Sequence, residues 1–180
     1  DDRATQFADA AYEVTCIWNG APVDHAAHLK RLARSLGELH IVAPSTPAAM
    51  TVVCREIVRL NRIDRGTLYV QVSRGVAPRA HPFPRNVQAG VVVTGKHGAG
   101  PDDSVAEKGV NVLVLPDARW GRCDIKTVGL LRKVLAKQAA EDAGAVETLL
   151  CAPDGTVTEA SASNAWIVAP DGALVTHPLG

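Results

Sequence analysis

The sequence predicts an α+β fold made of two lobes, each built from helices and strands. In residues 1–117, two amphipathic helix patterns lie among strand-like segments. Residues 118–180 contain one long helix-like run, followed by short strands with Asp-Gly turns between them. Helices that pack beside a sheet around one core form such lobes. We therefore expect two domains, residues 1–117 and 118–180, with a ligand cleft at the seam between them.

The first lobe should begin with a β-hairpin followed by two helices. Residues 12–18 alternate β-branched and aromatic residues with others and end at Asn19-Gly20, a strong signal for a tight turn. Asp24 can cap the next segment, in which leucines recur near helical spacing. Thr46-Pro47 is typical of the start of a second helix, which we expect to end at Asn61.

Short strands and one long helix should make up the rest of the chain. Residues 75–84 hold three prolines and one glycine, which predicts a loop, and the Gly-rich residues 95–109 predict a connection. The clearest helix is residues 127–143, which Gly144 is suited to end. The expected strands are residues 67–74, 91–93, 110–115, 146–151, 156–158, 165–169 and 173–176.

The composition argues against several classes of protein. With 180 residues, 47% of them hydrophobic, the chain can bury a real core. Nineteen basic and nineteen acidic residues balance, so no overall field attracts nucleic acid or an anionic membrane. The apolar runs are too short to span a bilayer, and the start lacks the pattern of a secretion signal. We expect a cytoplasmic protein.

The four cysteines are scattered, with no CxxC pair and no metal-ligand spacing to histidine. We interpret them as free thiols in a reducing compartment and expect no bound metal. The only methionine is Met50, and the chain ends directly after a strand-like segment. We therefore expect these residues to be part of a longer protein.

Lys126 and Glu159 are the residues with the most specific chemistry. A lysine becomes a covalent catalyst when its amine forms a Schiff base with a carbonyl group. A pyridine ring held in this way becomes an electron sink when a carboxylate keeps its nitrogen protonated. We interpret the two residues as able to bracket a pyridoxal phosphate ring. The simpler alternatives are an exposed lysine before a helix and a surface carboxylate at the end of a strand.

Blocks of residues along nearly the whole chain carry a resemblance to a known family. The chain resembles the fold-type IV class of pyridoxal phosphate enzymes, and within it the D-amino acid aminotransferases. The order and spacing of the blocks make a chance match improbable. The blocks include Asp2-Arg3, Tyr12-Glu13-Val14, His28-Leu29-Lys30-Arg31-Leu32, Pro78-Arg79-Ala80-His81, Arg122-Cys123-Asp124-Ile125-Lys126, Thr158-Glu159 and Ser163-Asn164.

The resemblance implies two lobes with a pyridoxal 5′-phosphate cleft between them and a second lobe whose C-terminal part lies beyond this sequence. It makes Lys126 the catalytic Schiff-base lysine, Glu159 the partner of the pyridine nitrogen and Arg31 the phosphate ligand. The segment that follows Glu159 would contribute further cofactor contacts. Its candidate residues are Ser161, Ser163 and Asn164.

The resemblance also implies how the substrate is held. Tyr12, Arg79 and His81 would bind the α-carboxylate, with Arg79 and His81 reaching across the interface of a homodimer. Arg79 and His81 flank one residue, so they share one side of an extended segment. The family pattern then indicates transfer of the amine of D-alanine to 2-oxoglutarate, giving pyruvate and D-glutamate.

Three alternatives remain open. Two keep the fold: a branched-chain amino acid aminotransferase and an enzyme similar to aminodeoxychorismate lyase. The Arg-x-His element argues against both, because those relatives do not normally carry it. The third is an inactive fragment. On the simplest interpretation, Arg31 lies on a solvated helix face, and Arg79 and His81 lie in a basic surface loop.

Overall fold

The computed structural model describes residues 1–99 and 103–178 and divides into two compact units. The first unit comprises Asp1–Pro101 and Ile125–Gly129, and the second comprises Asp102–Asp124 and Leu130–Gly180. Helices and strands occur in both units, as the sequence predicts.

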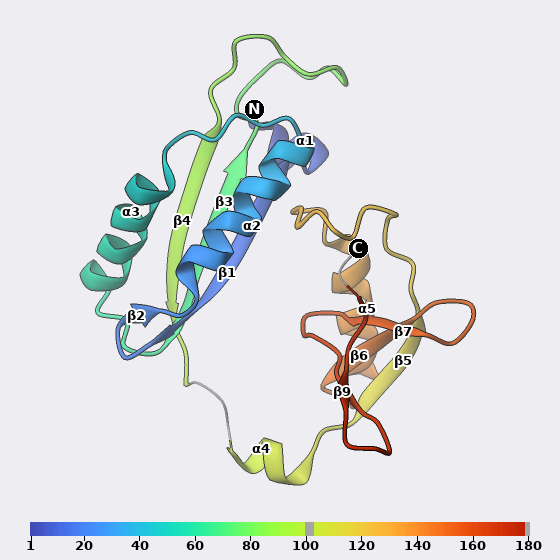
Figure 1. The fold of residues 1–180 in the computed structure, drawn as a ribbon. Coiled ribbons are helices and arrows are strands. Elements are labelled where there is room, and N and C mark those ends of the chain that lie inside the picture. The colour runs from blue at the N-terminus through green and yellow to red at the C-terminus, as the bar shows by residue number, and fades with distance from the viewer. Residues whose placement is uncertain (100–102, 179–180) are drawn as a thin grey trace. The chain divides into compact units, whose positions relative to one another are not determined.

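The first unit is an antiparallel sheet with helices packed against it. The strand order is β2-β1-β3-β4. Helix α2 runs along β1, and α3 packs beside β4 and β2 (Figure 1). A short helix, α1, precedes the sheet. The elements are α1 Arg3–Phe7, β1 Ala10–Trp18, β2 Ala21–Pro22, α2 His25–Glu38, α3 Pro47–Leu60, β3 Gly66–Ser73 and β4 Gly90–His97.

The core of this unit lies between one face of the sheet and the two long helices. Side chains alternate between the two faces of a strand, and in β1 every second residue from Ala11 to Ile17 is buried. Glu13 and Thr15 are the polar members of this inward row, each 1% exposed. The apolar core also includes Leu29, Leu32, Leu36, Met50, Cys54, Val58, Leu68, Val70 and Val72.

The helix caps differ in how well the sequence predicts them. Thr46 caps α3 as expected, since its hydroxyl accepts the backbone N–H of Ala49 at 3.2 Å. Asp24 makes no capping bond to α2, so the expected cap is wrong. The backbone of Asp24 is left-handed, with φ of 50°, and its carbonyl accepts the first bonds of the helix.

Some elements of the first part of the chain were not expected. Strand β4 continues to His97 because it pairs with β3 along its whole length, so the predicted connection begins later than residue 95. Helix α1 was not predicted, nor was α4, Asp103–Lys108, which lies within that connection. Residues 100–102 of the connection lie outside the described residues.

The second unit contains a three-stranded sheet in the order β5-β6-β7. Strands β5 and β6 are parallel, β7 is antiparallel to β6, and α5 packs on β6 and β5. A separate pair of short antiparallel strands, β8 and β9, follows. The elements are β5 Val112–Pro116, α5 Leu131–Asp142, β6 Glu147–Cys151, β7 Val157–Ala160, β8 Ile167–Val168 and β9 Leu174–Val175.

Helix α5 begins at Leu131, four residues later than predicted. The residues before it are bonded to β1 instead: Thr127 forms a bridge with Ala11, and the N–H of Val128 donates to the Ala10 carbonyl at 3.2 Å. Lys126 therefore lies beside a strand. The unit division also differs from the expected one at residue 117, because β5 pairs within the second unit while Ile125–Gly129 packs with the first.

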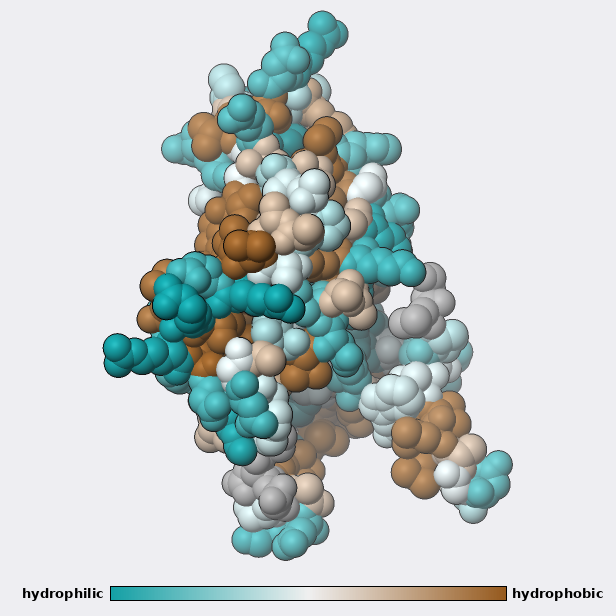
Figure 2. All heavy atoms as spheres, turned by 60° about the vertical axis from the view of Figure 1, so that its left-hand side comes forward, coloured by the Kyte–Doolittle hydropathy of each residue, from teal (hydrophilic) through white to brown (hydrophobic). Residues whose placement is uncertain are grey.

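The surface mixes polar and apolar side chains. Figure 2 shows hydrophilic residues projecting between small hydrophobic areas on the side of the molecule where α3 lies. Within residues 1–99 and 103–178, no helix combines the length and the apolar character needed to cross a membrane.

Candidate functional site

Lys126 lies against β1 in the first unit. Its carbonyl accepts the N–H of Tyr12 at 3.0 Å, and its own N–H donates to Ser35 Oγ at 3.4 Å. Its side chain is half-buried, and Nζ lies 4.6 Å from the centroid of the Tyr12 ring. Contacts on both sides of its backbone thus fix the direction in which the amine projects.

Arg31 is held by a buried carboxylate. Glu13, only 1% exposed, accepts Nε of Arg31 at 2.6 Å and Nη2 at 2.7 Å, and it also contacts Nδ1 of His28 at 2.8 Å. Burial disfavours the charge on Glu13, but the bonds from Arg31 and His28 outweigh burial, so the pKa of Glu13 lies below its ordinary value. The Arg31 side chain is 50% exposed.

Helix α2 connects the candidate phosphate ligand with the candidate catalytic lysine. Arg31 and Ser35 are four residues apart, so they lie on the same face of the helix. Ser35 bonds to the backbone of Lys126, and Arg31 bonds to Glu13, the residue after Tyr12. The structure therefore brings Lys126, Tyr12 and Arg31 to one end of β1.

Tyr12 takes part in an aromatic pair on the sheet. Its ring stacks on that of Tyr69 at a centroid distance of 5.5 Å, and Tyr69 donates its hydroxyl hydrogen to Gln71 Oε1 at 2.7 Å. Tyr12 and Gln71 are directly paired across β1 and β3. The ring of Tyr12 thus has a fixed orientation next to the lysine.

Arg79 and His81 lie in the predicted loop between β3 and β4, and both side chains are exposed. They are gathered around the ring of Phe7. The guanidinium carbon of Arg79 is 5.1 Å from the Phe7 centroid, and the ring of His81 is 5.5 Å from it. The pair thus presents two nitrogen-rich groups from one short segment, which suits the binding of a carboxylate.

Glu159 lies in β7 of the second unit, near two cations. Arg119 Nη1 is 3.5 Å from its Oε2, and Lys133 Nζ is 3.7 Å from the same oxygen. Arg119 is itself held by Asp117, which accepts Nε at 2.9 Å and Nη2 at 2.7 Å. Hydrogen bonds from Arg119, which outweigh burial, keep the pKa of Asp117 well below its usual range.

Ser161 and Ser163 are bound to a second carboxylate, that of Glu147 on β6. The hydroxyl of Ser161 donates to Oε1 and that of Ser163 donates to Oε2 at 2.9 Å. Ser161 is buried, while Ser163 and Asn164 are exposed. Burial opposes the charge on Glu147, but these hydroxyls and the Thr148 N–H outweigh burial and lower its pKa.

The sequence alone does not identify the residues that orient the candidate site. Glu13 was recognised only as part of a matching block, and Arg119, Asp117 and Glu147 were given no role. The one usable signal was Glu13, a charged residue at an inward position of an alternating strand. A carboxylate there must be paired, because a lone buried charge is costly.

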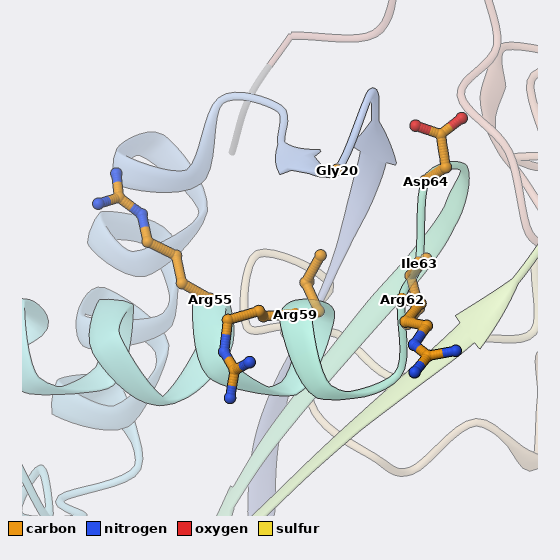
Figure 3. Close-up of a pocket in the computed structure, with 7 residues that line it drawn as sticks. Gly20, Arg55, Arg59, Arg62, Ile63 and Asp64 are labelled. Carbon is orange, nitrogen blue, oxygen red and sulfur yellow. The ribbon is translucent and has the colours of Figure 1, made fainter.

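A surface pocket of ≈ 340 Å³ beside α3 holds none of the predicted site residues. Its arginines do not converge: in Figure 3 the guanidinium groups of Arg55 and Arg62 point to opposite sides. Arg59 is paired with Glu56 at 2.6 Å. The residues that line this pocket are Gly20, Arg55, Val58, Arg59, Arg62, Ile63 and Asp64.

The cysteines offer little reactive chemistry. All four are free, and burial raises the pKa of Cys54 to about 11. Burial also raises the pKa of Cys123, whose thiol lies 3.0 Å from the Trp120 carbonyl. In the part of the chain that the structure describes, no three His, Cys, Asp or Glu residues gather in a way that could hold a metal ion.

Known proteins are similar to this chain in sequence and in fold. A D-alanine aminotransferase of Staphylococcus aureus (strain N315) is 38% identical over 180 residues, which cover 99% of this chain and 63% of that protein. The 4-amino-4-deoxychorismate lyase of Pseudomonas aeruginosa superposes with a TM-score of 0.82 at 25% identity, over 99% of this chain and 65% of the other. An Escherichia coli branched-chain amino acid aminotransferase gives 0.86 at 20% identity, over 97% and 60%.

The chain thus spans less than two thirds of the length of these proteins. The solved structures share the predicted fold, with mixed helices and strands in the same arrangement. The model of the family "Amino-transferase class IV" matches residues 10–180, which is nearly the whole chain. The chain therefore belongs to the class IV aminotransferase family.

Proposed function

We propose that the protein containing this chain is a pyridoxal phosphate-dependent aminotransferase for D-amino acids. Family membership and the relative named D-alanine aminotransferase support this proposal. The position of Lys126 is the observation that carries it. Its amine lies over Tyr12, at the end of β1 where α2 carries Arg31.

The residues of the first unit fit the proposed cofactor. Lys126 offers a primary amine for a covalent bond to the aldehyde, and Arg31 offers a planar donor for the phosphate. When bound, pyridoxal phosphate withdraws electrons from the substrate α-carbon. Lys126 Nζ would then move the proton at that carbon, and Glu13 would hold Arg31 in place.

The second unit would supply the remaining cofactor contacts. Glu159 is proposed to accept a hydrogen bond from the protonated nitrogen of the pyridine ring, with Arg119 and Lys133 holding the carboxylate. Asn164 is exposed and could donate to the cofactor directly, whereas Ser163, also exposed, would first have to exchange its hydrogen bond to Glu147. The buried hydroxyl of Ser161 is bonded to Glu147, so its proposed contribution acts through the shape of the segment.

The substrate proposal rests on Tyr12, Arg79 and His81, which would bind the α-carboxylate. We infer a homodimer in which Arg79 and His81 come from the partner, and a D-amino acid such as D-alanine as donor with 2-oxoglutarate as acceptor. The free cysteines agree with a cytoplasmic location. Branched-chain transamination and aminodeoxychorismate lyase-like activity use the same fold. The Arg-x-His element favours transamination of D-amino acids over both of these activities.

A trapping experiment on the intact protein tests the covalent role of Lys126. After addition of pyridoxal phosphate and reduction with borohydride, peptide mass analysis should find the cofactor mass on the peptide that contains Lys126. The Lys126→Ala variant should lose this adduct and the visible absorbance, whereas Lys96→Ala, which changes an exposed lysine on β4, should keep both. An adduct that persists in Lys126→Ala would contradict the assignment.

Substrate tests then separate the alternatives. If the protein is a D-amino acid aminotransferase, we expect it to form pyruvate from D-alanine with 2-oxoglutarate and to turn over L-alanine much more slowly. Preferential turnover of L-leucine would favour a branched-chain enzyme, and release of pyruvate from aminodeoxychorismate would favour a lyase. A protein that neither binds the cofactor nor turns over any of these substrates would be the inactive form.

A further inference from the structure

The first residues of the chain lie alongside the loop that carries Arg79 and His81. The N–H of Arg3 donates to the Gly75 carbonyl at 3.0 Å, and the N–H of Ala77 donates to the Asp1 carbonyl at 3.3 Å. Asp2 and Val76 form an antiparallel bridge between these contacts. The beginning of the loop is therefore paired with the residues that lead into α1.

Arg3 extends this contact to the middle of the loop. Its side chain is 3% exposed, and its Nη1 donates to the Ala80 carbonyl at 2.6 Å and its Nη2 to the His81 carbonyl at 3.4 Å. Its Nε donates to Asp9 at 2.7 Å. The planar guanidinium group thus uses several donors at once to join α1 to the loop.

Asp9 ties this arginine to the rest of the first unit. It also accepts Nε of Arg74 at 2.7 Å and Nη2 at 3.0 Å, and Arg74 donates in turn to the carbonyls of Leu39 and His40. Both arginines are almost fully buried. The anchor of the loop is therefore part of the core, because Asp9 is bound by both Arg3 and Arg74.

Phe7, the last residue of α1, contacts the side chains of the loop. Arg3 lies over the Phe7 ring at 4.6 Å, while Arg79 at 5.1 Å and His81 at 5.5 Å also lie against it. A cation near an aromatic face is attracted by the ring. The backbone of the loop is thus held by Arg3, and the two side chains share one aromatic neighbour.

We propose that Arg3 and Phe7 are positioning residues for the carboxylate-binding pair Arg79 and His81, so that helix α1 pre-organises the loop for its substrate. This rests on the proposed function of Arg79 and His81. A loop that is already ordered loses less conformational entropy when the carboxylate binds. Loss of the anchor should therefore weaken substrate binding while the bond-making residues stay in place.

The anchoring itself can be measured without any substrate. In the intact protein, trypsin cleavage after Arg79 and amide exchange of residues 79–81 should both rise in Arg3→Lys and Phe7→Leu, by about ten-fold if the loop opens ~1.4 kcal/mol more easily. Lysine keeps the charge beside Asp9 but cannot also reach the two carbonyls. Arg59→Lys, on the exposed ion pair of α3, should behave as the unchanged protein.

Steady-state kinetics then test whether the anchoring of the loop affects substrate binding. In Phe7→Leu we expect KM for D-alanine to rise by about ten-fold, with kcat and the Kd of pyridoxal phosphate within about two-fold of the unchanged protein. If kcat, KM and cofactor binding all deteriorate together, the residues are merely structural and the proposal is wrong. Unchanged loop exchange in both variants would also overturn it.

If the proposed function is wrong, the same variants still test the positioning role. If the unchanged protein binds the cofactor but does not use D-alanine, the KM comparison is made with the amino acid that it does use. A rise in KM for that amino acid, with the same loop opening, supports the positioning role. No rise overturns it. If Arg3→Lys does not fold, Phe7→Leu alone decides, because it leaves the buried ion pairs with Asp9 intact.

Discussion

The backbone and the side chain of Lys126 both meet Tyr12. The N–H of Tyr12 donates to the carbonyl of Lys126 at 3.0 Å, and Nζ of Lys126 lies 4.6 Å from the centroid of the Tyr12 ring. The strand pairing therefore sets where the lysine amine lies relative to the aromatic face. The same ring stacks on Tyr69, which limits its movement.

The first prediction concerns this ring. Tyr12→Phe keeps the aromatic face and should therefore lower the free energy of unfolding less than Tyr12→Leu does. Tyr12→Leu loses the stacking on Tyr69 and the attraction of the lysine, together about 1–2 kcal/mol. Urea denaturation of both variants measures the difference. Equal stability of the two would show that the ring contributes only its bulk.

The second prediction concerns acid stability and Glu13. Because the pKa of Glu13 in the folded protein lies below its ordinary value of 4.5, the ionised carboxylate stabilises the fold above that pH. This contribution is lost as the pH falls from 4.5 through the folded-state pKa. Glu13→Gln should therefore cost about 2 kcal/mol at pH 7, the loss expected for hydrogen bonds to a charged group, and should lose less stability on acidification.

The measurement is a series of denaturation curves between pH 7 and pH 3. Glu56→Gln is the matched control, because Glu56 also pairs with an arginine but does so on the surface of α3. Its effect should be smaller at every pH, since exposed ion pairs contribute little. Parallel pH profiles for Glu13→Gln and the unchanged protein would rule out the inferred coupling.

The third prediction concerns the turn after β7. Glu147 receives hydrogen bonds from Ser161, from Ser163 and from the backbone N–H of Ala162 at 3.3 Å. Glu147→Gln should destabilise the protein by about 2 kcal/mol and Ser163→Ala by about 1 kcal/mol. Glu141→Gln, an exposed change on α5, should cost less than about 0.5 kcal/mol. A Glu147→Gln variant as stable as Glu141→Gln would show that this cluster does not hold the turn.

The fold was predictable where local pattern decides it. Strand β1 and helices α2 and α3 follow from alternation, from helical spacing and from the Thr46 cap, all of which depend on neighbours in the sequence. The start of α5 was not predictable in this way. Thr127 and Val128 have bonding partners on β1 more than a hundred residues earlier, and that tertiary pairing overrides the helical pattern.

The candidate site was predictable for the residues with distinctive chemistry and not for those that hold them. Lys126 and Glu159 were identified by the reaction that such groups perform and by resemblance. Arg3 was not given a role, because its contact with the Ala80 carbonyl joins residues 77 positions apart and leaves no periodic signal. The tertiary structure decides which charged side chains contact one another.

The last prediction concerns the hinge at which the Arg79 loop leaves β3. Gly75 has φ of +108°, and a Cβ there would lie 2.0 Å from the carbonyl oxygen of Gln88, which is backbone and cannot turn aside. Gly75→Ala must therefore move the loop as well as strain its own backbone.

Gly144, which follows α5, provides the matched control. Its φ is +70°, but an added Cβ meets nothing within 4 Å, so Gly144→Ala carries the backbone strain alone, about 1–2 kcal/mol. We expect Gly75→Ala to cost about 2 kcal/mol more in denaturation experiments. It should also raise amide exchange in residues 79–81, which Gly144→Ala leaves unchanged. Equal costs for the two variants would mean that the loop accommodates the methyl group, and that the close approach of Gly75 to Gln88 does not define its course.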